Sequence, residues 1–234
     1  MTIYHFRIYL LLTSIVILVI AVPILRKNPI EMRYTRPLMG TLVEIALIGD
    51  DEKVLKEAAD TAFSEMERLE AMISHYRGDS ELSMVNRMAG GGWVKVSPEL
   101  LDVIGASLRF SELSRGAFDV TMGVLGKVWD FSNTALGERP PPPLEAVKEL
   151  LPLVDYRQIV VDREKSSVRL NKAGMRINLG GIAKGYIVGK AVEVIKARGV
   201  KRGIIHAGGD MFVFQDSSGP PFKIGIQHPR NRGK

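Results

Sequence analysis

Residues 175–199 read MRINLGGIAKGYIVGKAVEVIKARG and join an alternating segment to a helical one through a pair of glycines. Residues 176–179 alternate apolar and polar side chains, which is typical of a short, half-buried strand. The pair Gly180-Gly181 lets the backbone turn tightly and approach a ligand closely. Apolar residues then recur at helical spacing up to Gly199, which is placed to end a helix in the left-handed conformation. The stretch therefore predicts a strand, a glycine turn and a helix.

The start of this helix is a candidate anion site. The free N–H groups and positive dipole end of a helix N-terminus attract anions, and Lys184 adds a positive charge one turn in. A plain strand-to-helix connection explains the same glycines equally well. Lys184 is followed by Gly185 rather than Ser or Thr, so this is no Walker loop, and GGIAKG lacks the spacing of the dinucleotide fingerprint. Phosphate binding here needs support from the rest of the sequence.

Residues 1–28 are predicted to form an N-terminal membrane anchor. Residues 8–25 carry no charged side chain, and at ~1.5 Å per residue they just reach across a hydrocarbon core. A cleaved signal peptide is the alternative, but the small-residue cleavage pattern is poor and Pro23 interrupts it. The chain has no cysteine, which excludes a lipoprotein anchor, a disulfide framework and a thiolate metal site.

The charge pattern argues against nucleic-acid binding. The formal net charge is +6, but the basic residues are scattered among 26 acidic ones, without a Lys/Arg block or interleaved aromatic residues. We interpret the excess as a mildly basic surface next to an anionic membrane. The four histidines show no metal-ligand spacing.

The remaining pattern mixes helices with hairpin-like strands and lacks the regular strand-helix alternation of a doubly wound sheet. Residues 33–38 read as a link, and Met39-Gly40 as a turn. The expected strands are residues 41–47, 93–96, 159–161, 168–170, 211–214 and 222–227. Helices are expected to begin after Asp50-Asp51, after Asp79 or Ser80 and at Ser97-Pro98, with a further one at residues 144–151.

Two single residues stand out as candidates. Asp119 is the only carboxylate in an apolar, glycine-interrupted run up to Val128. It either needs a partner to offset its desolvation or is a helix N-cap. Tyr76 lies on a predicted loop, where an exposed aromatic ring is either incidental or a stacking surface for a planar ligand.

Four segments in this order resemble the ApbE family of flavin transferases, also called FAD:protein FMN transferases. They are PLMGTLVEI, YRGDSELSMVN, GAFDVTMGVLGKVWDF and INLGGIAKGYIVGKAVEVIKARGVKRGIIHAGGD. The likeness covers residues 34–230. It implies an α+β, T-fold-related domain at residues 29–234, with a largely antiparallel sheet, flanking helices and FAD in a cleft between two halves.

The resemblance also implies a function. Family members are bacterial inner-membrane enzymes that face the periplasm and use Mg²⁺ to split FAD. They transfer the FMN moiety to a threonine hydroxyl of a partner protein, forming a phosphoester and releasing AMP. The partners are acceptor subunits of Nqr-type and Rnf-type membrane redox complexes.

Site residues follow from the same resemblance. Asn178 stands where many relatives have Asp, so it keeps a hydrogen-bonding side chain but loses a negative charge. Tyr76 would pack on the flavin ring. The implied FAD-binding residues are Met39, Tyr76, Ala117, Phe118, Asp119, Asn178 and Lys184, and the implied magnesium ligand is the backbone carbonyl of Gly181.

The chain ends at Lys234, where family members continue with a segment that supplies an Asp and a Thr to the magnesium site. Mg²⁺ takes about six oxygen ligands, so Gly181 alone is not sufficient. We therefore expect the C-terminal part of the domain to be missing, because the chain is a fragment of a longer gene product or a protein with impaired catalysis.

Two functions and two topologies compete. The alternative to the transferase is a membrane-tethered FAD-binding module, or an FAD pyrophosphatase, without transfer activity. For topology, basic residues are more numerous after the apolar run than before it, which alone would leave the globular part in the cytoplasm. We follow the resemblance and expect a periplasmic domain.

Overall fold

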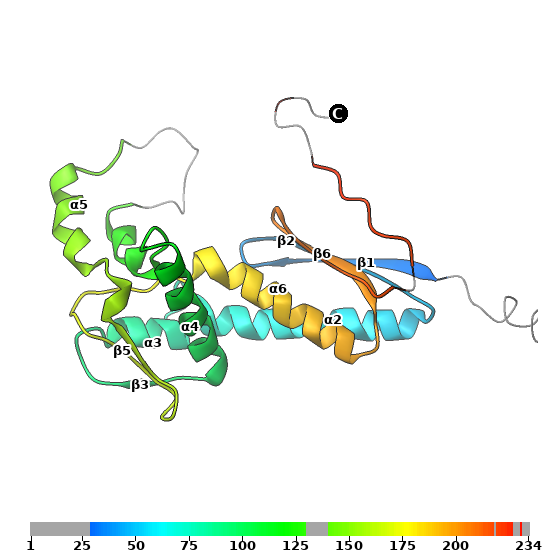
Figure 1. Ribbon diagram of the computed structural model, residues 1–234, viewed down its shortest axis with the longest axis horizontal. Helices are drawn as coiled ribbons and strands as arrows, with labels where there is room; N and C mark the ends of the chain where they lie inside the picture. Colours follow the sequence, from blue (N-terminus) through cyan, green and yellow to red (C-terminus); the bar gives the residue numbers. More distant parts are fainter. Residues whose placement is uncertain (1–28, 130–139, 218, 227–229, 231–234) are drawn as a thin grey trace, which may run out of the picture.

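The structure is a computed structural model that describes residues 29–129, 140–217, 219–226 and 230. The molecule is elongated, and the long helix α2 runs along most of its length (Figure 1). In chain order the strands and helices are β1 (Ile30–Leu38), β2 (Thr41–Gly49), α2 (Glu52–Ile73), α3 (Glu81–Arg87), β3 (Val94–Lys95), α4 (Pro98–Leu113), η1 (Val120–Lys127), α5 (Leu144–Leu150), η2 (Leu151–Leu153), η3 (Tyr156–Gln158), β4 (Ile159–Asp162), β5 (Ser167–Leu170), α6 (Gly180–Ala197), β6 (Arg202–Ala207) and β7 (Asp210–Phe214).

The first lobe is built on a four-stranded antiparallel sheet in the order β1-β2-β6-β7. The β1-β2 hairpin turns through Met39 and Gly40, whose φ angles of 53° and 69° suit a two-residue turn that matches the strand twist. The β6-β7 hairpin turns through Gly208 and Gly209, again with positive φ. Two hairpins distant in sequence are thus joined through the β2-β6 pairing.

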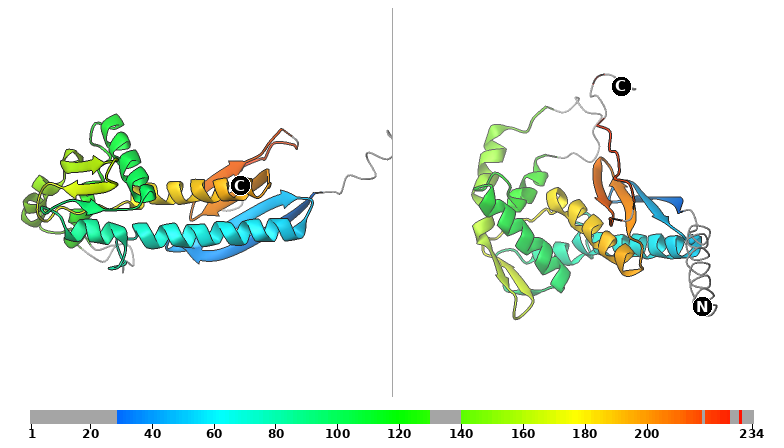
Figure 2. Two further views of the ribbon diagram at one scale, coloured as in Figure 1. Left: turned by 90° about the horizontal axis from the view of Figure 1, so that it is seen from below. Right: turned by 45° about the vertical axis from the view of Figure 1, so that its right-hand side comes forward.

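Helices α2 and α6 pack against each other and cover one face of this sheet (Figures 1 and 2). Alternate β2 residues, among them Ile45 and Leu47, are fully buried beneath them. On α2, residues at helical spacing such as Phe63 and Met66 are also fully buried. Asp51 begins α2 as predicted, because its side chain accepts hydrogen bonds from the N–H groups of the first turn.

The second lobe is the chain between α2 and α6, and it lies around the end of α2 that is remote from the N-terminal strand (Figure 1). It contains α3, α4, η1, α5 and a small antiparallel sheet in the order β3-β5-β4. Ser97 caps α4 through a side-chain hydrogen bond, as predicted, and of the two candidates Asp79 and Ser80 it is Ser80 that caps α3. The α+β architecture with antiparallel sheets and flanking helices is therefore confirmed.

Three local predictions are wrong. Residues 33–38 belong to strand β1, which pairs along its whole length with β2. Residues 175–179 form no strand, because their backbone bonds go to a side chain and to η1 rather than to a neighbouring strand. Residues 222–226 are likewise not in a strand, and the expected end at residue 227 lies outside the described residues.

The predicted anchor, residues 1–28, also lies outside the described residues. Within the described part of the chain, no helix is both long and apolar enough to cross a membrane.

Candidate functional site

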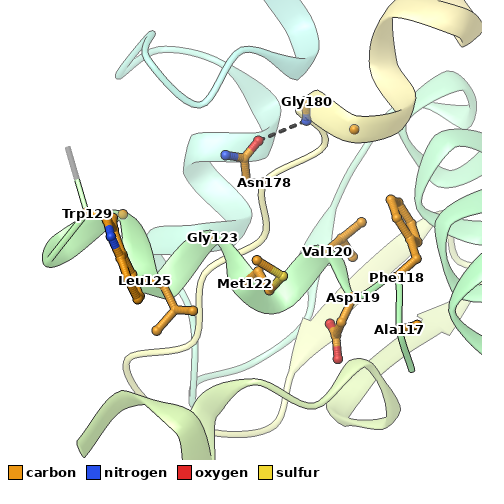
Figure 3. A pocket seen from close by; sticks show the side chains of 12 residues that line it. Ala117, Phe118, Asp119, Val120, Met122, Gly123, Leu125, Trp129, Asn178 and Gly180 are labelled. Atoms are coloured by element: carbon orange, nitrogen blue, oxygen red, sulfur yellow. Dashed lines mark hydrogen bonds between the residues drawn. The ribbon is translucent and has the colours of Figure 1, made fainter. Parts of the chain in front are cut away.

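A cavity of about 600 Å³ opens where α6 begins and faces η1 and the segment before it (Figure 3). Phe118 and Trp129 lie toward opposite ends of it, with η1 between them. The side chains that line it are mostly apolar, and the polar ones come from Asp119 and Asn178. The full lining is Ala117, Phe118, Asp119, Val120, Met122, Gly123, Leu125, Gly126, Trp129, Asn178, Gly180 and Gly181.

The extended segment before α6 forms one wall and is held from two sides. The Asn86 side chain donates to the Ile177 carbonyl oxygen at 3.0 Å and accepts from the Ile177 N–H at 2.7 Å. On the other side, the Asn178 N–H donates to the Val120 carbonyl oxygen of η1 at 2.8 Å. Met175, Ile177 and Leu179 are buried in alternation, so the segment has the burial pattern of a strand without its ladder.

Gly123 allows η1 to lie directly on this segment. A Cβ at residue 123 would be 2.7 Å from the Arg176 carbonyl oxygen and 2.8 Å from the Asn178 nitrogen. Such distances are shorter than van der Waals contact, so only glycine fits without a shift of the backbone.

The N-terminus of α6 keeps one backbone donor free. The Asn178 Oδ1 accepts from the Gly180 N–H at 2.8 Å, which is the dashed contact in Figure 3. The N–H groups of Ile182 and Ala183 donate to the Leu179 carbonyl oxygen. In the described part of the chain, the Gly181 N–H has no partner, and Gly181 lines the cavity. This donor and the helix dipole make that end of the cavity favourable for an anion.

Asp119 satisfies both interpretations of its sequence position. It is the N-cap of η1, since its Oδ1 accepts from the Thr121 N–H at 2.8 Å. Its other oxygen accepts from the Tyr156 N–H at 2.9 Å. The carboxylate thus joins η1 to η3 and fixes the position of neighbouring Phe118 in the cavity wall.

Three of the predicted residues lie outside this cavity. Lys184 Nζ is 3.4 Å from the Asp210 carboxylate at the start of β7. Met39, in the β1-β2 turn, is partly buried against the core. Tyr76 is 81% exposed and contacts the His75 ring, with the two ring centroids 3.9 Å apart. The structure brings together Ala117, Phe118, Asp119, Asn178 and Gly181.

The surroundings of Gly181 do not amount to a magnesium site. Among the described residues, no group of three His, Cys, Asp or Glu side chains is placed to hold a metal ion. The side-chain oxygens in the cavity lining, those of Asp119 and Asn178, already accept backbone N–H groups. Mg²⁺ demands near-octahedral oxygen coordination, so these residues alone do not fit it.

Sequence reasoning missed two kinds of site residue. The apolar lining from Met122, Leu125 and Trp129 lies within the segment GAFDVTMGVLGKVWDF, but its amphipathic pattern is too short to reveal a cavity. Asn86 ends the segment YRGDSELSMVN, yet its contact with Ile177 spans 91 positions and leaves no local signal.

Comparisons with known proteins agree with the observed architecture. The sequence model of the ApbE family matches residues 39–234. The FAD:protein FMN transferase of Treponema pallidum is 28% identical over 212 residues, covering 84% of this chain and 58% of the relative. The crystal structure of the ApbE protein from Thermotoga maritima superposes with a TM-score of 0.77 at 29% identity, over 87% of this chain and 65% of that one.

The flavin transferase ApbE from Vibrio cholerae gives a TM-score of 0.74 at 25% identity and covers 86% of this chain. The chain spans less than two thirds of each of these relatives, 58% of the Treponema protein and 65% of both solved structures. The match to the family model extends over most of the chain, and the two-lobed fold agrees with it. The chain belongs to the ApbE family.

Proposed function

We propose that this protein transfers FMN from FAD to an acceptor protein. The observation that carries the proposal is the cavity at the start of α6, which collects Ala117, Phe118, Asp119, Asn178 and Gly181. These residues come from two segments that are distant in sequence, and all five are positions that the family resemblance implies for FAD or its metal. The names of the relatives support the same activity.

The cavity has two features that suit a dinucleotide. Aromatic and aliphatic side chains, led by Phe118 and Trp129, offer flat apolar surface to a ring. The free Gly181 N–H and the dipole of α6 favour a phosphate where the helix begins. Asn178 holds the first turn of α6 through its bond to Gly180, and Asn86 holds the segment that carries Asn178.

In the proposed reaction, a threonine hydroxyl of the acceptor loses its proton to solvent, and its oxygen forms a bond to the FMN phosphorus. The phosphoanhydride bond to the AMP moiety breaks, and AMP leaves with the bridging oxygen. Bound Mg²⁺ would neutralise charge on the phosphoryl oxygens. Since the described residues do not complete a site for this ion, we assign Gly181 only as one candidate ligand and route no step through the metal.

The proposal includes location and partners. We propose that residues 1–28 anchor the protein in a bacterial inner membrane, that the domain faces the periplasm, and that the acceptors are subunits of Nqr-type or Rnf-type complexes. The apolar run at residues 8–25 and the family resemblance support this. A reporter fused after Lys234 is expected to be active only in the periplasm, and cytoplasmic activity would contradict it.

A second candidate is FAD binding, or cleavage of FAD to FMN and AMP, without transfer. It is favoured by the incomplete metal ligand set among the described residues. The test is to incubate the full chain with FAD, Mg²⁺ and a threonine-containing acceptor peptide, and to follow covalent flavin by in-gel fluorescence and mass. Covalent FMN on threonine supports transfer. FMN and AMP free in solution support cleavage alone, and tight FAD binding without products supports a binding module.

A further inference from the structure

A second cavity, of about 410 Å³, lies beside the same extended segment but shares no lining residue with the first. We call it the basic pocket. Its lining contains three cationic side chains and no carboxylate, together with the exposed Tyr76 ring and its neighbour His75. The residues that line it are His75, Tyr76, Gly78, Ser83, Asn86, Arg87, Lys127, Gly174, Met175 and Arg176.

The three cations are Arg87, Lys127 and Arg176, and they come from three separate segments of the chain. Within the part of the chain that the structure describes, none of them forms an ion pair with a carboxylate. Other cations in the described part of the chain do form such pairs, including Arg77, which pairs with Asp79 on the two sides of Gly78. Three unpaired positive charges around one concave surface raise its electrostatic potential and attract anions.

The pocket walls are tied to one another before any ligand binds. The Arg87 guanidinium donates to the Gly78 carbonyl oxygen at 2.5 Å, and Arg176 donates to the His75 carbonyl oxygen at 3.5 Å. Each guanidinium has five N–H donors, so most of them stay available to a ligand. Asn86 joins α3 to the segment that carries Arg176. The two guanidinium groups are therefore held close to their binding positions, which reduces the entropic cost of association.

His75 adds no positive charge near neutral pH. Partial burial, together with the charge of Arg176, lowers the pKa of its imidazole below the usual value. The neutral ring contacts Tyr76, and both rings border the cationic surface.

We propose that the basic pocket binds a phosphate dianion, as a phosphate monoester or as inorganic pyrophosphate, through Arg87, Lys127 and Arg176. Guanidinium groups match the phosphate oxygens with paired donors, and the ammonium group of Lys127 adds a point charge. The site shares no lining residue with the cavity at α6, and Tyr76 is its one lining residue that the family resemblance implies for FAD.

The test is isothermal titration of the full 234-residue chain with inorganic pyrophosphate. Arg87→Gln and Lys127→Gln are each expected to weaken binding about tenfold, because each removes a charge-assisted contact. The Lys127 side chain forms no hydrogen bond to described residues and is exposed, so its variant should unfold at the wild-type temperature. Arg87→Lys, which keeps the charge, should lose less affinity than Arg87→Gln. Lys53→Gln, which removes an exposed charge at the start of α2, should bind as the wild type does.

Gly181→Val, which places a side chain in the α6 cavity, separates the two sites. If Gly181→Val weakens pyrophosphate binding while Arg87→Gln and Lys127→Gln do not, the proposal is overturned. It is also overturned if the wild type shows no specific binding. Titration with AMP and with FMN separates the two sources of the phosphate. Equal affinity for AMP and pyrophosphate indicates recognition of the phosphate alone. Tighter nucleotide binding that Tyr76→Ala abolishes indicates a nucleotide phosphate whose base or flavin ring stacks on Tyr76.

Discussion

Among the glycines that line the cavity, Gly123 is the one where an added methyl group would make the shortest contacts. Helix η1 and the segment that leads into α6 form facing walls, and they touch at Gly123. In Gly123→Ala the new Cβ would lie 2.7 Å from the Arg176 carbonyl oxygen, 2.8 Å from the Asn178 nitrogen and 2.9 Å from the Ile177 carbonyl carbon. All three are backbone atoms, so no side-chain rotation relieves the contact.

The energetic cost has two parts. Overpacking of this kind costs about 1 to 3 kcal/mol. Separating the walls lengthens the 2.8 Å bond from the Asn178 N–H to the Val120 carbonyl oxygen, and loss of such a bond costs about 1 kcal/mol or more. We therefore expect Gly123→Ala to lower the free energy of unfolding by about 2 to 4 kcal/mol. For a domain of this size, that corresponds to a fall of roughly 4 to 16 °C in the unfolding temperature.

Gly126→Ala is the matched control. Gly126 lies in the same short helix and lines the same cavity, but a Cβ there has no atom within 4 Å. Its stability should stay within about 1 kcal/mol of the wild type. The assay is urea unfolding followed by circular dichroism, with thermal unfolding in parallel. If Gly123→Ala and Gly126→Ala are equally stable, the close contact between η1 and the segment before α6 is wrong.

Three further substitutions test a side-chain contact, the ionisation of His75 and the packing of the core. Asn86→Ala should lower the free energy of unfolding by about 2 to 4 kcal/mol, because both backbone groups of Ile177 lose their partner. A loss below about 0.5 kcal/mol, measured by urea unfolding, would contradict the two hydrogen bonds between Asn86 and Ile177. Folding lowers the pKa of His75 through burial and the charge of Arg176, so the unfolded chain binds that proton more readily. The free energy of unfolding should therefore fall as the pH drops through 6.5 and below, and it should fall less steeply in His75→Asn. Above pH 6.5 the difference in free energy between the two proteins should stay constant. Parallel slopes at every pH would argue against a partly buried His75. Phe63→Ala should cost about 3 to 5 kcal/mol, since the ring is fully buried between α2 and the sheet, and a near-neutral result in thermal unfolding would place the core elsewhere.

Elements with a strong local period could be predicted from the sequence. Helix α2 has a continuous apolar stripe and an Asp cap, and α4 has the Ser-Pro start, so both begin where predicted. The local pattern of β1 favours a link instead, because polar alternation and Pro37 weaken the strand signal. Its strand character comes from pairing with β2 across the turn at Met39, and this pairing is a tertiary contact.

The segment at residues 175–179 shows the reverse case. Its alternation is real, and alternate side chains are buried, but no strand lies beside it. The Asn86 side chain supplies the hydrogen bonds that a neighbouring strand would have provided. Contacts of this kind join residues that are distant in sequence, so they leave no local pattern. The family resemblance could therefore name single residues of the cavity, but it could not reveal the wall that η1 forms or the basic pocket beside residues 175–176.

The most direct test of the account is the affinity of the full chain for FAD, measured by quenching of flavin fluorescence. Gly181→Val places a side chain in the cavity beside Phe118, because a Cβ at residue 181 would lie 3.1 Å from the Phe118 ring. A Cβ at Gly185 on the same helix meets nothing within 4 Å, so Gly185→Val is the control. We expect saturable FAD binding by the wild type and by Gly185→Val, and binding at least about tenfold weaker in Gly181→Val, a loss of about 1.4 kcal/mol. Wild-type affinity in Gly181→Val, or no saturable binding by the wild type, would contradict it.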